Sequence, residues 1–93
     1  MSTEDHAEGE FTVQSELGLH ARPAGRFVAL AGRFESEVEV SRGQEWVSGT
    51  SVLSILSLAA AQGTVIKVKA VGVDAQRAVA ELGALIEAVD EGQ

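Results

Sequence analysis

Polar and apolar residues alternate along four short stretches of this chain, at residues 10–14, 37–40, 45–47 and 64–71. A period of two places successive side chains on opposite faces of an extended backbone, so each stretch predicts a half-buried β-strand. The fourth stretch is the clearest, because Ile66, Val68 and Ala70 share one face while Lys67 and Lys69 share the other.

Three other stretches repeat apolar residues every three or four positions, which is typical of amphipathic helices. The first helix is predicted at residues 21–31, with Gly32 placed to end it in the left-handed conformation. The last helix is predicted to begin after Asp74, a residue type that caps helices. Its apolar stripe consists of Ala75, Ala78, Val79, Leu82, Leu85, Ile86 and Val89.

The second helix carries apolar residues on two sides. Val52, Ile55 and Ala59 form one stripe, which is predicted to face the core, whereas Leu53 and Leu56 are displaced from it. Since a small domain has little interior to bury two sides of one helix, this helix is expected to expose an apolar patch.

Taken in order, the predicted elements are strand, helix, strand, strand, helix, strand and helix. None of the strand–helix–strand units in this order requires its two strands to pair in parallel. We therefore expect an α+β fold with an antiparallel sheet and helices on one face. The length of 93 residues suits a single domain, predicted over residues 10–90. Residues 1–9 are polar and acidic without periodicity, and they are predicted to form a disordered leader.

The charge balance narrows the class of partner. The formal net charge is −7, which argues against nucleic acid and against direct binding to anionic membranes. The chain contains no cysteine and shows no cluster of metal ligands, so neither a disulfide framework nor a metal site is expected. Without an apolar run of membrane-spanning length or a signal peptide, a cytoplasmic protein is the simplest interpretation.

Candidate chemistry lies where the first strand and its loop lead into the first helix. His20 precedes Ala21, Arg22 and Pro23 there. Backbone N–H groups in the first turn of a helix have no intrahelical partner, and together with the helix dipole they attract anions. Pro23 suits a first turn because its missing N–H costs nothing there, and Arg22 adds a planar fork of donors for phosphate oxygens. A nucleophilic imidazole at such a position predicts phosphoryl chemistry on His20.

Residues 18–24, Gly-Leu-His-Ala-Arg-Pro-Ala, resemble the phosphohistidine motif of HPr, the histidine-containing phosphocarrier family of the bacterial sugar phosphotransferase system. Residues 47–58 resemble the second-helix segment of the same family, and residues 62–64 and 71–75 resemble its entries to the last strand and last helix. The resemblance implies an HPr-like open-faced β-sandwich, a four-stranded antiparallel sheet with three helices on one face in the order βαββαβα.

The resemblance also implies a reaction. His20 would accept a phosphoryl group at Nδ1 from enzyme I, which draws on phosphoenolpyruvate, and would pass it to enzyme IIA components for sugar uptake. The Ala21 and Arg22 amides and the Arg22 guanidinium are expected to hold the phosphoryl oxygens. Such a protein is a carrier that serves partner enzymes and not an independent catalyst, and it needs no cofactor.

A docking surface follows from the same resemblance. Both partners would contact the His20 loop together with Ala24 and the apolar residues Val52, Leu53 and Leu56 of the second helix. An apolar patch beside a small basic site suits a weak, transient interface.

Ser51 aligns with the regulatory serine that an HPr kinase/phosphorylase modifies in part of the family. The chain departs from the family pattern beside it: Thr50 stands where lysine is usual, and Ser48-Gly49 replaces an asparagine-containing pair. Two interpretations of Ser51 stay open, a helix N-cap and a regulatory phosphorylation site.

Two alternative functions compete with sugar transport. A paralogous regulatory phosphorelay protein, nitrogen-related or controlled through Ser51, would share the chemistry at His20 and differ in its partners. A ferredoxin-like module that binds RNA or a small molecule is disfavoured, because the chain is acidic and has only three Phe, one Trp and no Tyr.

Overall fold

Four strands form one antiparallel sheet in the computed structural model, which describes residues 5–88. Along the chain the elements are β1 (His6–Thr12), α1 (Ala21–Ala31), β2 (Glu37–Ser41), β3 (Trp46–Ser48), α2 (Val52–Ser57), β4 (Val65–Val71) and α3 (Ala75–Glu87). The strand order across the sheet is β1-β4-β2-β3. This is the predicted α+β architecture, an open-faced sandwich with the element order βαββαβα.

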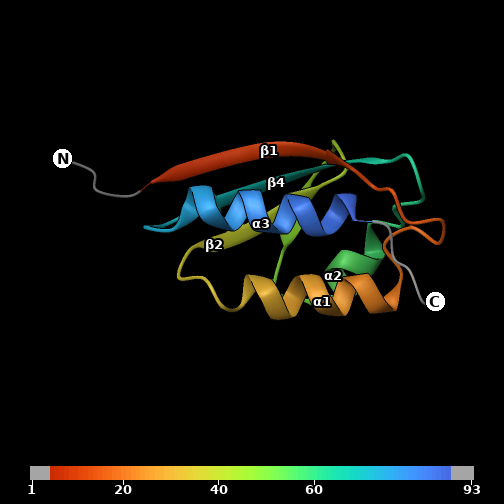
Figure 1. Ribbon diagram of the computed structural model, residues 1–93, viewed down its shortest axis with the longest axis horizontal. Coiled ribbons are helices and arrows are strands. Elements are labelled where there is room, and N and C mark those ends of the chain that lie inside the picture. The colour runs from red at the N-terminus through yellow and green to blue at the C-terminus, as the bar shows by residue number, and fades with distance from the viewer. Residues whose placement is uncertain (1–4, 89–93) are drawn as a thin grey trace.

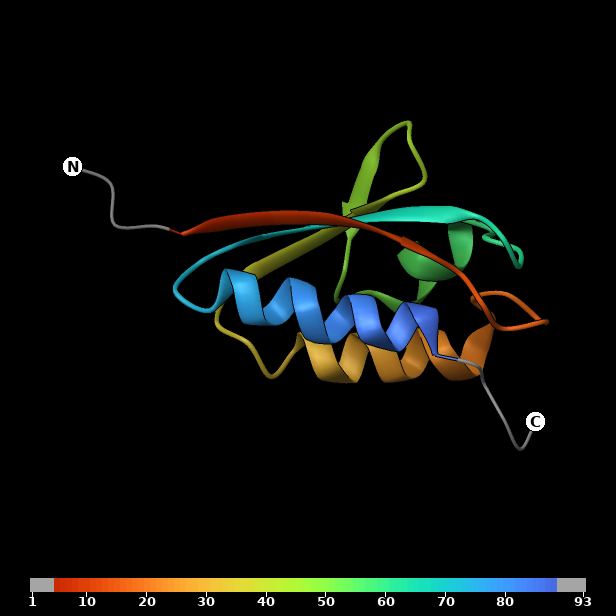
Figure 2. The same cartoon turned by 45° about the horizontal axis from the view of Figure 1, so that its top comes forward.

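The helices cover one face of the sheet, and Figures 1 and 2 show α1 and α3 lying side by side along the strands. The N-terminal end of α1, the short α2 and the C-terminal end of α3 gather at the same end of the molecule. Between sheet and helices lies a single cluster of buried side chains, in which Phe27, Ile55, Ile66 and Leu82 are among the largest. Burying this apolar surface is the main force that fastens the helices to the sheet.

The register of the central strand β4 confirms the predicted alternation. Ile66, Val68 and Ala70 are fully buried beneath the helices. On β1 the residues opposite them are Phe11, Gly9 and Ala7, so these three positions also face inward. A Cβ added to Gly83 of α3 would collide with the Phe11 ring, which means that α3 approaches β1 as closely as a glycine allows.

The predicted leader at residues 1–9 is wrong for its last four residues, because β1 begins at His6 and pairs with β4 from His6↔Val71 to Thr12↔Val65. Two of the inward positions in this stretch are Ala7 and Gly9, which carry almost no hydrophobic signal. The neighbouring strand β4 is seven residues long, and pairing with it makes β1 longer than the stretch in which polar and apolar residues alternate. Residues 1–4, and the predicted end of the domain beyond residue 88, lie outside the described residues.

The predicted left-handed end of α1 at Gly32 is also wrong, since Gly32 has a right-handed φ of −69°. The end of the helix instead tightens into a 3₁₀-type turn. Arg33 N–H donates to Leu30 O at 3.0 Å, and Phe34 N–H donates to Ala31 O at 3.2 Å. These i→i−3 bonds satisfy the last carbonyls of the helix and turn Phe34 into the core.

Asp74 precedes α3 as predicted, but its carboxylate makes no cap hydrogen bond to that helix. It accepts instead from Ser36 Oγ at 2.6 Å, Glu35 N at 2.9 Å and Ser36 N at 3.0 Å. The Ser36 hydroxyl and then the Glu35 amide hold the pKa of Asp74 below its ordinary value of 3.8. Asp74 therefore ties the α1–β2 connection to the start of α3, at the end of the molecule remote from α2.

The open face of the sheet is charged. Lys69 Nζ lies 3.4 Å from Glu39 Oε1 and 4.3 Å from the centroid of the Trp46 ring. Exposed ion pairs add little to stability, so the sheet is held mainly through its helix-covered face. Within the described range, none of the helices is both long and apolar enough to span a membrane.

Candidate functional site

The loop between β1 and α1 is anchored to the segment that precedes β4. Val13 N–H donates to Thr64 O and Gly63 N–H donates to Val13 O, at 2.9 and 2.8 Å. Farther along, Leu19 N–H donates to Ala60 O at 2.9 Å, and the Leu19 side chain is buried. The backbone is therefore pinned on both sides of the loop tip and immediately before His20.

His20 is the N-cap residue of α1, with an extended backbone at φ −83° and ψ −168°. Its carbonyl accepts the first intrahelical bond from Ala24 N at 3.0 Å, while its side chain makes no cap hydrogen bond to the helix. The imidazole is half-buried. The helix that starts at Ala21 runs for 11 residues, so its first-turn N–H groups and its dipole favour an anion beside His20.

An open hollow connects His20 with α2. Apart from His20 itself, every residue that lines it is apolar: Leu17, Leu19, Leu56, Ala59, Ala60 and Ala61. Leu17, near the tip of the loop between β1 and α1, is 62% exposed. The tertiary structure thus places one imidazole at the edge of an apolar depression formed by the loop and by the second helix.

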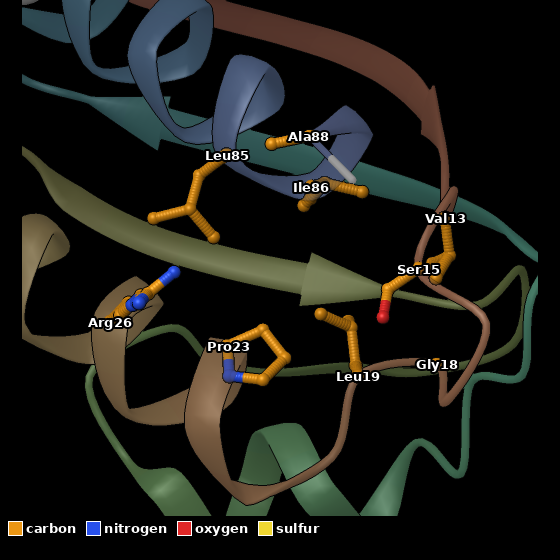
Figure 3. Close-up of a pocket in the computed structure, with 9 residues that line it drawn as sticks. All are labelled: Val13, Ser15, Gly18, Leu19, Pro23, Arg26, Leu85, Ile86 and Ala88. Atoms are coloured by element: carbon orange, nitrogen blue, oxygen red, sulfur yellow. The ribbon is translucent and has the colours of Figure 1, made fainter. Parts of the chain in front are cut away.

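A second, smaller cavity of about 50 Å³ lies behind the same loop, between α1 and the C-terminal end of α3. Figure 3 shows Pro23 and Arg26 of α1 facing Leu85 and Ile86 of α3 across it. Its volume suits one or two water molecules and not a phosphorylated ligand. His20 does not line this cavity, so the candidate chemistry belongs to the open hollow.

The apolar surface predicted for the second helix is present. Leu53 is 79% exposed, and Val52 and Leu56 are exposed as well, whereas Ile55 alone of this helix is buried. The predicted core stripe is therefore wrong for Val52 and for Ala59, which is exposed beyond the helix end. A helix of only six residues places one fully buried side chain, Ile55, in the core, and its other large apolar side chains are exposed.

Ala24, predicted as a further docking residue, is not available at this surface. Its exposed fraction is 0%, because α1 turns this position toward the core beside Phe27. Ala24 therefore has no exposed surface with which it could contact a partner.

The family model described as "PTS HPr component phosphorylation site" matches residues 7–88. The phosphocarrier protein HPr of Pseudomonas aeruginosa is 39% identical over 89 residues, covering 90% of this chain and 96% of that protein. HPr of Neisseria meningitidis is 42% identical over 72 residues, covering 77% of this chain and 81% of that protein.

The chain belongs to the HPr family of the phosphotransferase system. A crystal structure of HPr from Bacillus anthracis superposes with a TM-score of 0.84 at 32% sequence identity, covering 88% of this chain and 98% of that one. The family assignment and the open-faced sandwich expected from residues 18–24 and 47–58 are both confirmed.

In this HPr-family chain the remaining predicted site residues lie as follows. Arg22 is exposed at the second position of α1, directly after Ala21. Ser51 is the N-cap of α2, and its Oγ accepts from Ser54 N at 3.2 Å. Residues 5–88 contain no group of three metal-ligating side chains that could hold an ion.

Sequence reasoning missed two contributors to the hollow. One is Leu17, for which a second leucine in the loop before His20, beside Leu19, was an available signal. The other is the segment Ala59, Ala60 and Ala61, which carries no local signal, since alanine suits core, helix and surface alike. Only the approach of this segment to the His20 loop gives it a place in the site.

Proposed function

We propose that His20 accepts a phosphoryl group at Nδ1 from phosphorylated enzyme I, for which phosphoenolpyruvate is the ultimate donor, and passes it to enzyme IIA components. The observation that carries this proposal is the position of the imidazole, half-buried as the N-cap of α1 and beside an apolar hollow. Phosphoryl transfer depends chiefly on positioning and charge stabilisation, and a helix N-terminus supplies both.

The roles of the neighbouring groups follow from helix geometry. The Ala21 and Arg22 amides point out of the first turn and would donate to the phosphoryl oxygens. The Arg22 guanidinium would add charge-assisted hydrogen bonds. Together they would stabilise the dianion that forms on His20 without closing it off from the next acceptor.

Each transfer conserves the phosphoryl group. In the first step an imidazole nitrogen lone pair attacks phosphorus, and the bond from phosphorus to the donor breaks. In the second step the acceptor attacks phosphorus and the N–P bond breaks, which returns the imidazole to its starting form. The partners complete the site in both steps, so this chain acts as a carrier, and we propose that it works in the cytoplasm with these enzymes.

The docking surface of this proposal comprises Val52, Leu53 and Leu56. All three are exposed on α2, and Leu56 lines the hollow together with His20. A partner that covers α2 would thereby come close to the imidazole. The small apolar area suits an encounter that must dissociate after each transfer.

Labelled phosphoenolpyruvate with a catalytic amount of enzyme I tests the proposal. The wild-type protein should become labelled and His20→Ala should not. His6→Ala is the matched control, because His6 is exposed on β1, and it should label like the wild type. Label retained by His20→Ala would contradict the assignment, as would a wild-type label that survives dilute acid, which cleaves N–P bonds and spares serine esters.

Regulation through Ser51 is a second candidate, and one observation favours it. Ser51 caps α2 immediately before the exposed Val52 and Leu53, so a phosphate there would add negative charge beside the docking surface. Incubation with ATP and an HPr kinase/phosphorylase should then label wild type but not Ser51→Ala. Phosphorylation should also slow transfer to His20, and a transfer rate unaffected by the modification would count against this role.

A further inference from the structure

Arg42, in the turn between β2 and β3, reaches across to the C-terminal end of α2. Its Nη1 donates to Leu58 O at 2.9 Å and to Ala59 O at 3.2 Å. The turn is shaped for this reach, since Gly43 has a φ of +112° and its N–H donates to Ser41 Oγ at 2.9 Å. A cation at a helix C-terminus meets carbonyls that have no intrahelical donor, so the contact is favourable.

The carbonyls that Arg42 holds belong to an unusual piece of backbone. Ala59 has a φ of +51°, the left-handed region that alanine seldom occupies, and it is the one non-glycine with positive φ among the described residues. The next residue, Ala60, offers its carbonyl to Leu19 N–H at 2.9 Å. One short stretch is therefore held by Arg42 on one side and by the residue before His20 on the other.

We infer that Arg42 is a positioning residue for phosphoryl transfer. Arg42 is not among the residues that line the hollow. By holding Leu58 and Ala59 it fixes where α2 ends, and through Ala60 it fixes the His20 loop relative to that helix. The docking surface and the imidazole then stay fixed relative to each other, so that a partner can contact both in a single encounter.

The kinetic part of this inference rests on the proposed function, whereas the structural part does not. If Arg42 holds the Ala59–Ala60 backbone, its loss should loosen the Leu19–Ala60 hydrogen bond even in the isolated protein. If it also positions the docking surface, its loss should raise the KM for the phosphorylated donor protein more than it lowers kcat.

Arg42→Gln removes the charge and the fork of donors, and Arg42→Lys keeps the charge with a different donor geometry. Arg33→Gln is the matched control, because it makes the same change of charge at an exposed residue just beyond α1. Amide hydrogen exchange by NMR at Leu19 reports the loop, and exchange at Leu82 in α3 reports global unfolding. Transfer kinetics with phosphorylated enzyme I report KM and kcat.

Arg42→Gln should raise the KM roughly three- to fivefold, the range expected for one exposed charged contact. It should also speed exchange at Leu19 while leaving Leu82 unchanged. Arg42→Lys should recover part of both effects, and Arg33→Gln should show neither.

Equal Leu19 exchange in Arg42→Gln and Arg33→Gln would overturn the inference, as would an unchanged KM. Exchange that rises equally at Leu19 and Leu82 would also overturn it, since Arg42 would then act on global stability alone. If the wild type accepts no phosphoryl group, the proposed function fails, and the exchange data still decide whether Arg42 controls the loop.

Discussion

Gly18 and Ala60 approach each other so closely that a Cβ on Gly18 would collide with the carbonyl oxygen of Ala60. That same oxygen accepts the hydrogen bond from Leu19 N–H, so the contact and the bond together seat the His20 loop on the segment that follows α2. Gly18 also has a φ of +74°, which glycine adopts without the penalty that a side chain incurs.

Gly18→Ala should therefore combine backbone strain with a clash. We expect the free energy of unfolding to fall by about 2–4 kcal/mol in denaturant titrations, since left-handed strain alone costs about 1–2 kcal/mol. Gly63→Ala separates the two causes, because Gly63 has a φ of +92° with open space around a Cβ. If both variants lose the same stability, the contact with Ala60 contributes nothing.

Ala59→Gly should stabilise the protein, although glycine normally weakens a fold. Relieving a left-handed alanine at φ +51° is expected to raise the free energy of unfolding by roughly 1 kcal/mol, measured by urea denaturation. Ala80→Gly, at an exposed position inside α3, should instead lose about 1 kcal/mol. A loss in both variants would contradict the strain assigned to Ala59.

Asp74 should make stability depend on pH in the acid range. Its folded pKa is lowered, so its contribution is complete above the unfolded pKa of about 4 and is lost as pH falls through the lower folded value. Asp74→Asn should be less stable than wild type at neutral pH, and the gap should close in acid. Urea titrations between neutral pH and strong acid measure this difference in the free energy of unfolding. Glu16→Gln, at an exposed position, is the control. A gap that stays constant across that range would refute the linkage.

Arg22→Gln should slow phosphoryl transfer to His20 while leaving the fold intact, because Arg22 is exposed. Losing a charge-assisted hydrogen bond to the phosphoryl group corresponds to about a ten- to hundredfold drop in kcat/KM. Arg33→Gln controls for the change in net charge. Equal rates for the two variants would mean that Arg22 acts only through the overall field of the protein.

Leu53→Ala should separate binding from stability. With Leu53 79% exposed, its truncation should change the free energy of unfolding by less than about 0.5 kcal/mol. It should nevertheless raise the KM for the donor protein by about fivefold or more if it is a main docking contact. Val73→Ala, also 70% exposed but outside this surface, should alter neither quantity.

Ile55→Ala, on the buried side of the same helix, should show the opposite pattern. Truncating this fully buried side chain should cost about 2–5 kcal/mol of stability. A KM effect of Leu53→Ala no larger than that of Val73→Ala would remove α2 from the docking surface.

The amino-acid sequence alone predicts five of the elements, namely the strands β2, β3 and β4 and the helices α1 and α3. In each of them the apolar side chains recur with the period of a strand or of a helix. Ile66, Val68 and Ala70 alternate cleanly, and their burial follows directly. The position of His20 at the start of α1 could be predicted for a similar reason, since the residues that define the start of that helix are its immediate neighbours in the chain.

What periodicity could not reveal depended on contacts between distant residues. The early start of β1 needed the partner strand β4, because Ala7 and Gly9 have too little side chain to mark a buried face. Asp74 became a link to Ser36, and not a cap, because the α1–β2 connection brings better donors to its carboxylate.

The order of residues therefore determined the fold class and the place of His20 on it, since both arise from interactions within a few positions of the chain. Only the tertiary structure decided how α2 meets the His20 loop, through Ala60 and Arg42, and which of the predicted docking residues face outward. The physical reason is that hydrogen bonds to the backbone of a distant segment depend on approach in space, which no single stretch of sequence encodes.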